Sequence, residues 1–173
     1  MKKSVLAGAA AAGVTLAAVV LPGTASAAET TVTFTIAAGN ISITAPGAAS
    51  LTENPLLDTA TGSITGVKVT DDRRGFSGWT ATASSTAFTN GTGEGTTSIG
   101  ADKVTYTAPL AIPTGVAVVT PGLPGTLAAA RNAQVATAVL GSNSVTWSPT
   151  LSVALPPDRT SGTYSGKITH SLA

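Results

Sequence analysis

Alternation with a period of two is the feature that most constrains the fold of this 173-residue chain. Short segments rich in Thr and Val carry an apolar side chain at every second position, as in "TVTFTIA" at 31–37 and "SVTWSPTLSVALP" at 144–156. Because successive side chains of a strand point to opposite faces, such segments predict half-buried β-strands. Turn sequences rich in Gly and Pro, such as "NGTGEG" and "TPGLPG", separate them.

We therefore expect an all-β fold, namely an antiparallel β-sandwich or partly open barrel of about eight or nine short strands. Pro149 cannot donate to a sheet ladder, so its strand is expected at an edge or with a bulge near its middle. Residues 134–140 also alternate, around Val135, Thr137 and Val139, which favours a strand over the alternative of a short helical turn near 128–131. The apolar residues expected to share a strand face are Val32, Phe34 and Ile36; Ile41 and Ile43; Val67 and Val69; Trp79, Ala81 and Ala83; Val104, Tyr106 and Ala108; Val116 and Val118; Val145, Trp147, Pro149, Leu151, Val153 and Leu155; and Tyr164, Ile168, His170 and Leu172.

The first residues have the layout of a secretory signal peptide. Lys2 and Lys3 precede a long uncharged stretch of Ala, Val and Leu, and Ala25-Ser26-Ala27 is a small-x-small cleavage site. A retained membrane helix is the alternative, but the apolar stretch is short for a span and contains a proline. We expect residues 1–27 to be the signal peptide and residues 28–173 to form one secreted domain without a membrane segment.

Composition excludes several classes of function. Without Lys2 and Lys3, seven basic and eight acidic side chains remain, which leaves no electrostatic footprint for nucleic acid. The chain has no cysteine and one histidine, His170, so thiol catalysis, iron–sulfur clusters and metal sites with several histidines are excluded within one chain. We expect no cofactor and no metal.

Four adjacent charges, Asp71, Asp72, Arg73 and Arg74, precede "GFSGW" in a chain of which only 10% is charged. The first interpretation is a strand end that enters a turn, in which a carboxylate on the apolar face of Val67 and Val69 pairs with Arg73 or Arg74. The second is a surface binding site. The third is an acid–base pair for glycoside cleavage with Glu94 as a further member, but adjacent strand residues point to opposite faces.

Aromatic residues and the histidine are the other candidates. Trp79 and Trp147 have faces that suit sugar rings, yet both lie on the apolar parity of their strands, which favours packing in the core. Tyr106 and Tyr164 follow the same pattern. His170 on an apolar face is typical of a half-buried structural histidine, and no Gly-x-Ser-x-Gly nucleophile elbow accompanies it. We therefore expect no catalytic residue.

Two stretches, "VKVTDDRRGFSGWTATAS" and "TLSVALPPDRTSGTYSGKITHSLA", together resemble the WxL domain of bacterial surface proteins. The resemblance covers essentially all of residues 28–173, and both Trp-x-Leu motifs depart from the family, being Trp79-Thr80-Ala81 and His170-Ser171-Leu172. The matching positions are Val69, Asp72, Arg74, Gly75, Gly78, Trp79, Gly162, Thr163, Tyr164, Gly166 and Thr169.

The resemblance implies a secreted β-rich domain that associates non-covalently with the cell wall, often with peptidoglycan. It also implies that Asp72, Arg74 and Gly75 hold the turn, which raises the question whether the unmatched Arg73 leaves a charge free for an anionic wall polymer. We expect a non-enzymatic cell-surface protein whose partner is a cell-wall polymer or a surface protein. The alternative is a freely secreted recognition module for a glycan or a partner protein. Candidate binding or motif residues are Asp72, Arg73, Arg74, Trp79, Tyr164 and His170.

Overall fold

The computed structural model describes residues 29–91 and 98–173, and the expected signal peptide lies outside them. Residues Ile36–Ala173 form one compact unit. In the described part of this unit, two antiparallel sheets, a small two-stranded sheet and a short 3-10 turn, Ala101–Lys103, make up the regular structure. The prediction of an all-β sandwich or partly open barrel is confirmed.

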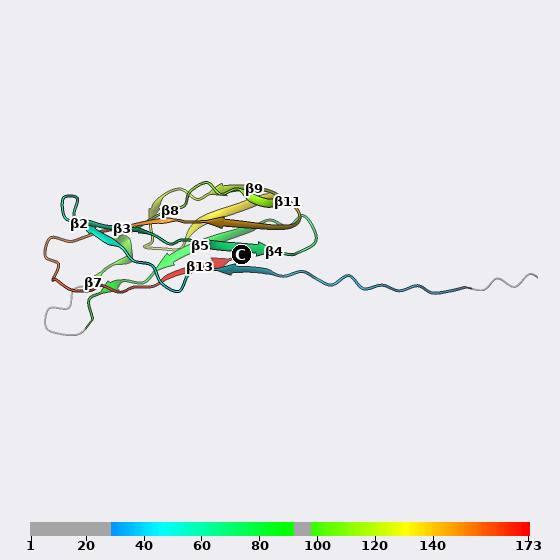
Figure 1. Ribbon diagram of the computed structural model, residues 1–173, viewed down its shortest axis with the longest axis horizontal. Helices are drawn as coiled ribbons and strands as arrows, with labels where there is room; N and C mark the ends of the chain where they lie inside the picture. Colours follow the sequence, from blue (N-terminus) through cyan, green and yellow to red (C-terminus); the bar gives the residue numbers. More distant parts are fainter. Residues whose placement is uncertain (1–28, 92–97) are drawn as a thin grey trace, which may run out of the picture. The chain divides into compact units, whose positions relative to one another are not determined.

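Six strands form the larger sheet. In Figure 1 the long strand β11 lies between β9 on one side and β4 and β5 on the other. β1 pairs with β4, and β13 pairs with β5. The bounds are β1 (Ile41–Thr44), β4 (Val67–Asp71), β5 (Trp79–Ser85), β9 (Pro113–Pro121), β11 (Arg131–Trp147) and β13 (Ile168–Leu172).

Five strands form the second sheet, in the order β10-β8-β12-β3-β2, and β6 pairs with β7 in the small sheet. Their bounds are β2 (Thr52–Asn54), β3 (Thr59–Ser63), β6 (Phe88–Thr89), β7 (Ser98–Ile99), β8 (Val104–Thr107), β10 (Gly125–Thr126) and β12 (Thr150–Ala154). Nine described strands have at least four residues, which is the expected number, but β3 has no apolar alternation and was not predicted, and the predicted strand at 31–37 is absent. The other four have two or three, which is too short for alternation to reveal.

One hydrophobic core joins the inner faces of the sheets. The predicted inward residues of β4, β5 and β8 are buried, and Trp79 and Trp147 are each only 3% exposed. In "SVTWSPTLSVALP" the expected alternate residues also face the core, although the two halves of this segment belong to different sheets. The chain crosses between the sheets at the fully buried Pro149, whose carbonyl accepts a hydrogen bond from the Ile64 amide at 3.0 Å. The expected edge position is wrong, because β11 and β12 both have neighbours on two sides.

Two other expectations about strand faces are wrong. Val116 and Val118 on β9 are more than half exposed, whereas Val119 is buried; adjacent valines leave the parity of such a strand ambiguous. On β11, Ala133, Gln134 and Ala136 are buried in place of Val135 and Thr137, because the register shifts at bulges. The alternative of a helical turn near 128–131 does not form.

The predicted strand at 31–37 is also absent. Residues 29–40 have no regular secondary structure, and Val32 and Phe34 are 82% and 83% exposed. Alternation predicts only that a segment is able to form a strand, since the strand itself requires a neighbour to complete its hydrogen-bond ladder.

Candidate functional site

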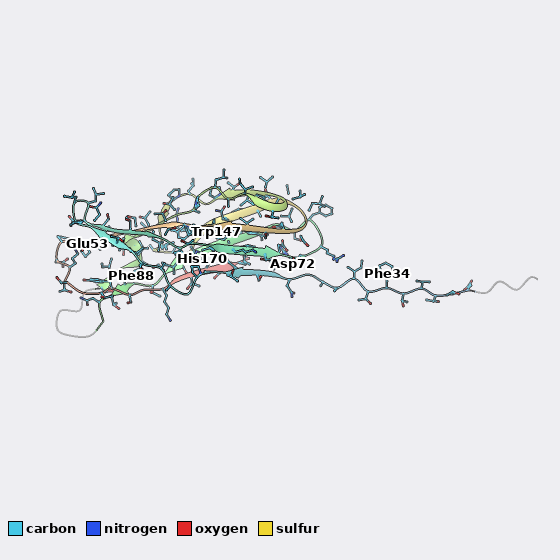
Figure 2. The ribbon with its side chains drawn as sticks, in the orientation of Figure 1. Phe34, Glu53, Asp72, Phe88, Trp147 and His170 are labelled. Atoms are coloured by element: carbon cyan, nitrogen blue, oxygen red, sulfur yellow. The ribbon has the colours of Figure 1, made fainter. Side chains whose placement is uncertain are left out.

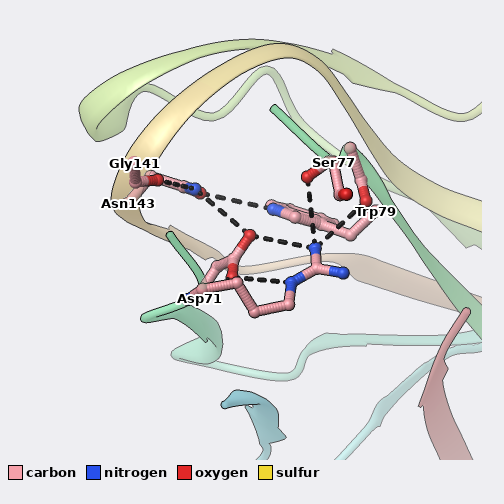
Figure 3. A network of polar contacts seen from close by, with 7 residues as sticks. Asp71, Ser77, Trp79, Gly141 and Asn143 are labelled. Carbon is pink, nitrogen blue, oxygen red and sulfur yellow. Dashed lines mark hydrogen bonds and ion pairs between the residues drawn. The ribbon is translucent and has the colours of Figure 1, made fainter. Parts of the chain in front are cut away.

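The charge cluster is the first candidate site, and the structure makes it a turn closed by an ion pair. Asp71 ends β4 with its side chain fully buried. Arg73 donates from Nε to Asp71 Oδ1 at 2.9 Å and from Nη2 to Oδ2 at 3.0 Å, and its backbone amide donates to Oδ1 (Figure 3). The guanidinium also donates to the carbonyls of Ser77 and Gly78, at 3.3 and 3.1 Å. One arginine therefore connects both ends of the turn.

The buried side of this pair continues into β11. Asn143 donates to Asp71 Oδ2 at 3.4 Å and to the Gly141 carbonyl at 3.4 Å, and its Oδ1 accepts a hydrogen bond from Trp79 Nε1 at 3.3 Å (Figure 3). The Gly141 amide donates in turn to the Gly75 carbonyl. The network therefore fastens the turn to the neighbouring strand and satisfies the polar atom of a core tryptophan.

Electrostatics holds Asp71 in its ionised form. The hydrogen bond from Arg73 lowers the pKa of the Asp71 carboxyl despite the opposing effect of burial, and the Asp71 carboxylate raises the pKa of Arg73. A carboxylate whose charged form is stabilised in this way and saturated with donors is a poor general acid or base. The arrangement matches the first interpretation of the charge cluster, a structural pair.

The assignment of roles within the cluster needs correction. Asp71 and Arg73 hold the turn, whereas Asp72 and Arg74, which the family resemblance implied, are exposed. In the described residues their side chains make no hydrogen bond or ion pair. Arg73 is not free for an anionic polymer. Asp72 contributes its backbone amide, which donates to the Asn40 carbonyl at 2.8 Å, and Glu94 lies outside the described residues.

A second cluster joins the two sheets around the histidine. Tyr106 comes from β8, Trp147 from β11 and His170 from β13, and Figure 2 shows Trp147 and His170 close together in the middle of the sandwich. Trp147 Nε1 donates to Tyr106 Oη at 3.0 Å, and that oxygen lies 3.1 Å from His170 Nε2. The histidine ring meets the Trp147 ring edge-on, with centroids 6.3 Å apart.

Burial dominates the protonation of this cluster. It raises the pKa of Tyr106 to about 12 and lowers the pKa of His170 below 6.5. A neutral His170 accepts at Nε2 from the tyrosine hydroxyl, while its buried Nδ1 has no hydrogen-bond partner among the described residues. The cluster therefore has the character of a core bridge between sheets.

A groove of about 870 Å³ is the third candidate, and among the predicted residues it contains Tyr164. Its lining combines the apolar side chains of Leu51, Phe88, Ile99 and Val153 with most of residues 157–165, which we call the rim. Tyr164 donates to the Thr160 carbonyl at 2.9 Å, which orders the rim. Figure 2 shows Phe88 and Glu53 at the end of the sandwich away from Asp72.

Sequence reasoning missed the charged residues of this groove. Arg159 Nη2 lies 3.1 Å from Glu53 Oε1 and 3.1 Å from Asp58 Oδ1, and these carboxylates raise the pKa of Arg159. Arg159 and Glu53 are 106 residues apart, so no local pattern reveals the contact. The only sequence signal for this contact was the arginine in "PPDRTSG", a segment whose composition predicts a turn.

The structure separates the predicted site residues instead of gathering them. Arg73 and Trp79 belong to the turn network, His170 to the core bridge and Tyr164 to the groove, while Asp72 and Arg74 face solvent. Within the described residues no three His, Asp or Glu side chains gather as a metal site would require. A helix with the length and apolarity to cross a membrane is likewise absent from them.

Comparison with known proteins found no matching family model, no matching curated protein and no matching solved structure.

Proposed function

We propose that the protein is a secreted, non-enzymatic bacterial surface protein that binds a cell-wall glycan, peptidoglycan in the first instance, non-covalently in the groove beside Tyr164. The observation that carries this proposal is the groove itself, about 870 Å³ and lined by both polar and apolar side chains. Concave sites of this size are typical of ligand binding.

The chemistry of the groove favours a neutral, amphipathic ligand. Its charged lining residues among those described, Glu53 and Arg159, pair with each other, so they present little net charge. Phe88 and Tyr164 are half-buried and offer ring surface, and Ser161 and Thr163 offer hydroxyl groups on the rim. Sugar rings combine apolar faces with hydroxyl edges and suit such a lining. Trp79 and Trp147 are buried and unavailable for stacking.

A non-catalytic role agrees with the state of the carboxylates. Glycoside hydrolysis requires two carboxyl groups that face each other across a cleft. At the groove, Glu53 and Asp58 are both bound by the same arginine, and Asp71 is buried in the turn network. The engagement of these carboxylates in ion pairs supports a non-catalytic role.

The second candidate is a recognition module that binds a partner protein. Exposed apolar side chains around β9 favour it: Leu110, Ile112, Val116 and Val118 are between 56% and 84% exposed. Apolar clusters on a protein surface commonly mark contacts with other proteins.

Co-sedimentation with purified peptidoglycan tests the wall-binding proposal. Ser161 is exposed on the rim, so Ser161→Trp fills the groove without removing a core contact. We expect this variant to bind at least tenfold more weakly, whereas Ser42→Trp, at an exposed position on β1, leaves binding unchanged.

Two results would contradict the proposal in different ways. Protein that stays in the supernatant across pH and salt excludes wall binding. Equal sedimentation of the wild type and Ser161→Trp keeps wall binding but excludes the groove as its site.

A further inference from the structure

Residues 31–37 have the sequence pattern of a strand but no regular secondary structure. Val32, Phe34 and Ile36 alternate with threonines, and these apolar side chains are 82%, 83% and 64% exposed. Exposure of three apolar side chains to water is unfavourable in free energy, so a partner that covers them would stabilise the segment.

β9 offers the complementary feature, a free strand edge. It pairs only with β11, so its other edge has no ladder partner among the described residues. Natural edge strands are usually protected by charge, shortness or proline. β9 has nine residues and no charged side chain, and its prolines lie only at its ends, Pro113 and Pro121.

The part of β9 beyond Gly115 matches the 31–37 segment in length and chemistry. Gly115 has a left-handed φ of +92° and bends the strand, and the stretch beyond the bend is Val116–Thr120, opposite which the register of β11 shifts once, between Thr137 and Leu140. This stretch has five residues, as does Val32–Ile36. Val116 and Val118 share the exposed face, and Leu140 lies beside Val116 as its cross-strand partner. Neither five-residue stretch carries a charge, so two copies meet without electrostatic repulsion.

We propose that the 31–37 segment of one copy adds as a strand to the free edge of β9 in a second copy of this chain. The backbone of the segment completes the hydrogen-bond ladder of β9, and Phe34 packs beside Val116 and Val118. Strand addition of this kind derives affinity from main-chain hydrogen bonds and specificity from alternate side chains. Donor and acceptor occur in the same chain, so a second copy supplies both halves of the contact. The inference is independent of the groove and of wall binding.

Substitution of each half separately tests the contact. Phe34→Ser removes the central apolar residue of the donor segment, and Val118→Lys places a charge on the acceptor edge. Both positions are exposed, so neither change disturbs the core. Phe76→Ser is the matched control, since Phe76 is also a highly exposed phenylalanine, at 81%. The measurement is molar mass by light scattering over a concentration series, with no wall polymer present.

We expect the unaltered protein and Phe76→Ser to associate as concentration rises, with Phe34→Ser and Val118→Lys each weakening association at least tenfold. An equimolar mixture of Phe34→Ser and Val118→Lys should restore association, because one variant keeps its acceptor edge and the other its donor segment. Amide hydrogen exchange should then show new protection at residues 116–120 and 32–36.

A protein that is monomeric at every concentration overturns the proposal. So does association that survives Val118→Lys, because the acceptor would then lie elsewhere. Failure of the mixture to associate, when each variant retains the circular dichroism spectrum of the wild type, likewise overturns it.

Discussion

Asp71 is fully buried at the end of β4, and the guanidinium of Arg73, two residues later, binds both oxygens of its carboxylate. The same guanidinium also holds the far end of the turn, because it donates to the carbonyls of Ser77 and Gly78. The pair is therefore the element that sets the geometry of the connection from β4 to the Trp79 strand.

Loss of the Asp71 charge should destabilise the fold. In Asp71→Asn the arginine loses its bidentate partner, and since its side chain is one third exposed, water compensates in part. We expect the free energy of unfolding to fall by about 2 kcal/mol, below the usual effect of breaking a fully buried pair. Urea denaturation measures it. Asp72→Asn, at the exposed neighbour, should change stability by less than about 0.5 kcal/mol; equal effects at both positions would contradict the assigned pairing.

Acid should destabilise the protein through His170. Burial lowers the pKa of His170 in the folded protein below 6.5, the value expected in the unfolded chain. At a pH between the folded and unfolded pKa values, the unfolded chain therefore binds a proton that the folded chain does not. Stability is therefore fully present above about pH 6.5 and falls on acidification, by at most about 1.4 kcal/mol per pH unit. His170→Gln should flatten the profile of unfolding free energy between pH 7 and 5. The lowered pKa of Asp71 acts only in more acidic solution, because its contribution is lost as pH falls below 3.8. An unchanged profile in His170→Gln would argue against a neutral buried ring.

Removal of the Tyr106 hydroxyl should cost more than removal of the Tyr164 hydroxyl. In Tyr106→Phe, the buried Nε1–H of Trp147 and the Nε2 of His170 both lose their partner. An unsatisfied buried donor costs about 1–3 kcal/mol. In Tyr164→Phe a half-buried hydroxyl loses one bond to the Thr160 carbonyl, which water can replace. Thermal unfolding of both variants compares the two losses, and a Tyr106→Phe protein as stable as the wild type would exclude the bridge as a stabilising contact.

A side chain at Gly78 should not fit. A Cβ there would lie 2.4 Å from the carbonyl oxygen of Ala136, a backbone atom of β11. Gly78→Ala therefore forces β5 and β11 apart, and we expect a loss of about 1–3 kcal/mol by chemical denaturation. Gly47→Ala is the control, because a Cβ at that position would have no atom within 4 Å and the φ of Gly47 is not left-handed. A Gly78→Ala protein of normal stability would show that the strands approach less closely.

Prediction from sequence succeeded where burial follows a strict alternation. Val67 and Val69, and Trp79, Ala81 and Ala83, are all buried on the expected face. It failed at β9, where Val118 and Val119 are adjacent and the wrong one was placed inside, and along β11, where bulges change the parity. A bulge depends on how two strands meet and leaves little trace in a single strand.

The candidate site was predictable only in part. The sequence indicated a turn, a strand beginning at Trp79 and a carboxylate on the apolar face that needed a partner. Which arginine supplies the partner depends on the path of the turn, and the structure selects Arg73 over Arg74. The groove could not be predicted from the sequence, because Glu53, Phe88 and Tyr164 come from segments far apart in the chain.

The sequence by itself determined the β class and the inward-facing residues of the regular strands, because alternation and turn chemistry act over a few neighbouring residues. The tertiary structure decided what depends on register between distant segments. It placed the crossing between sheets at Pro149, joined Tyr106 to His170 across 64 positions, and left residues 31–37 without regular secondary structure. A segment's own residues set its preference for a strand, whereas only a neighbouring strand completes its hydrogen bonds.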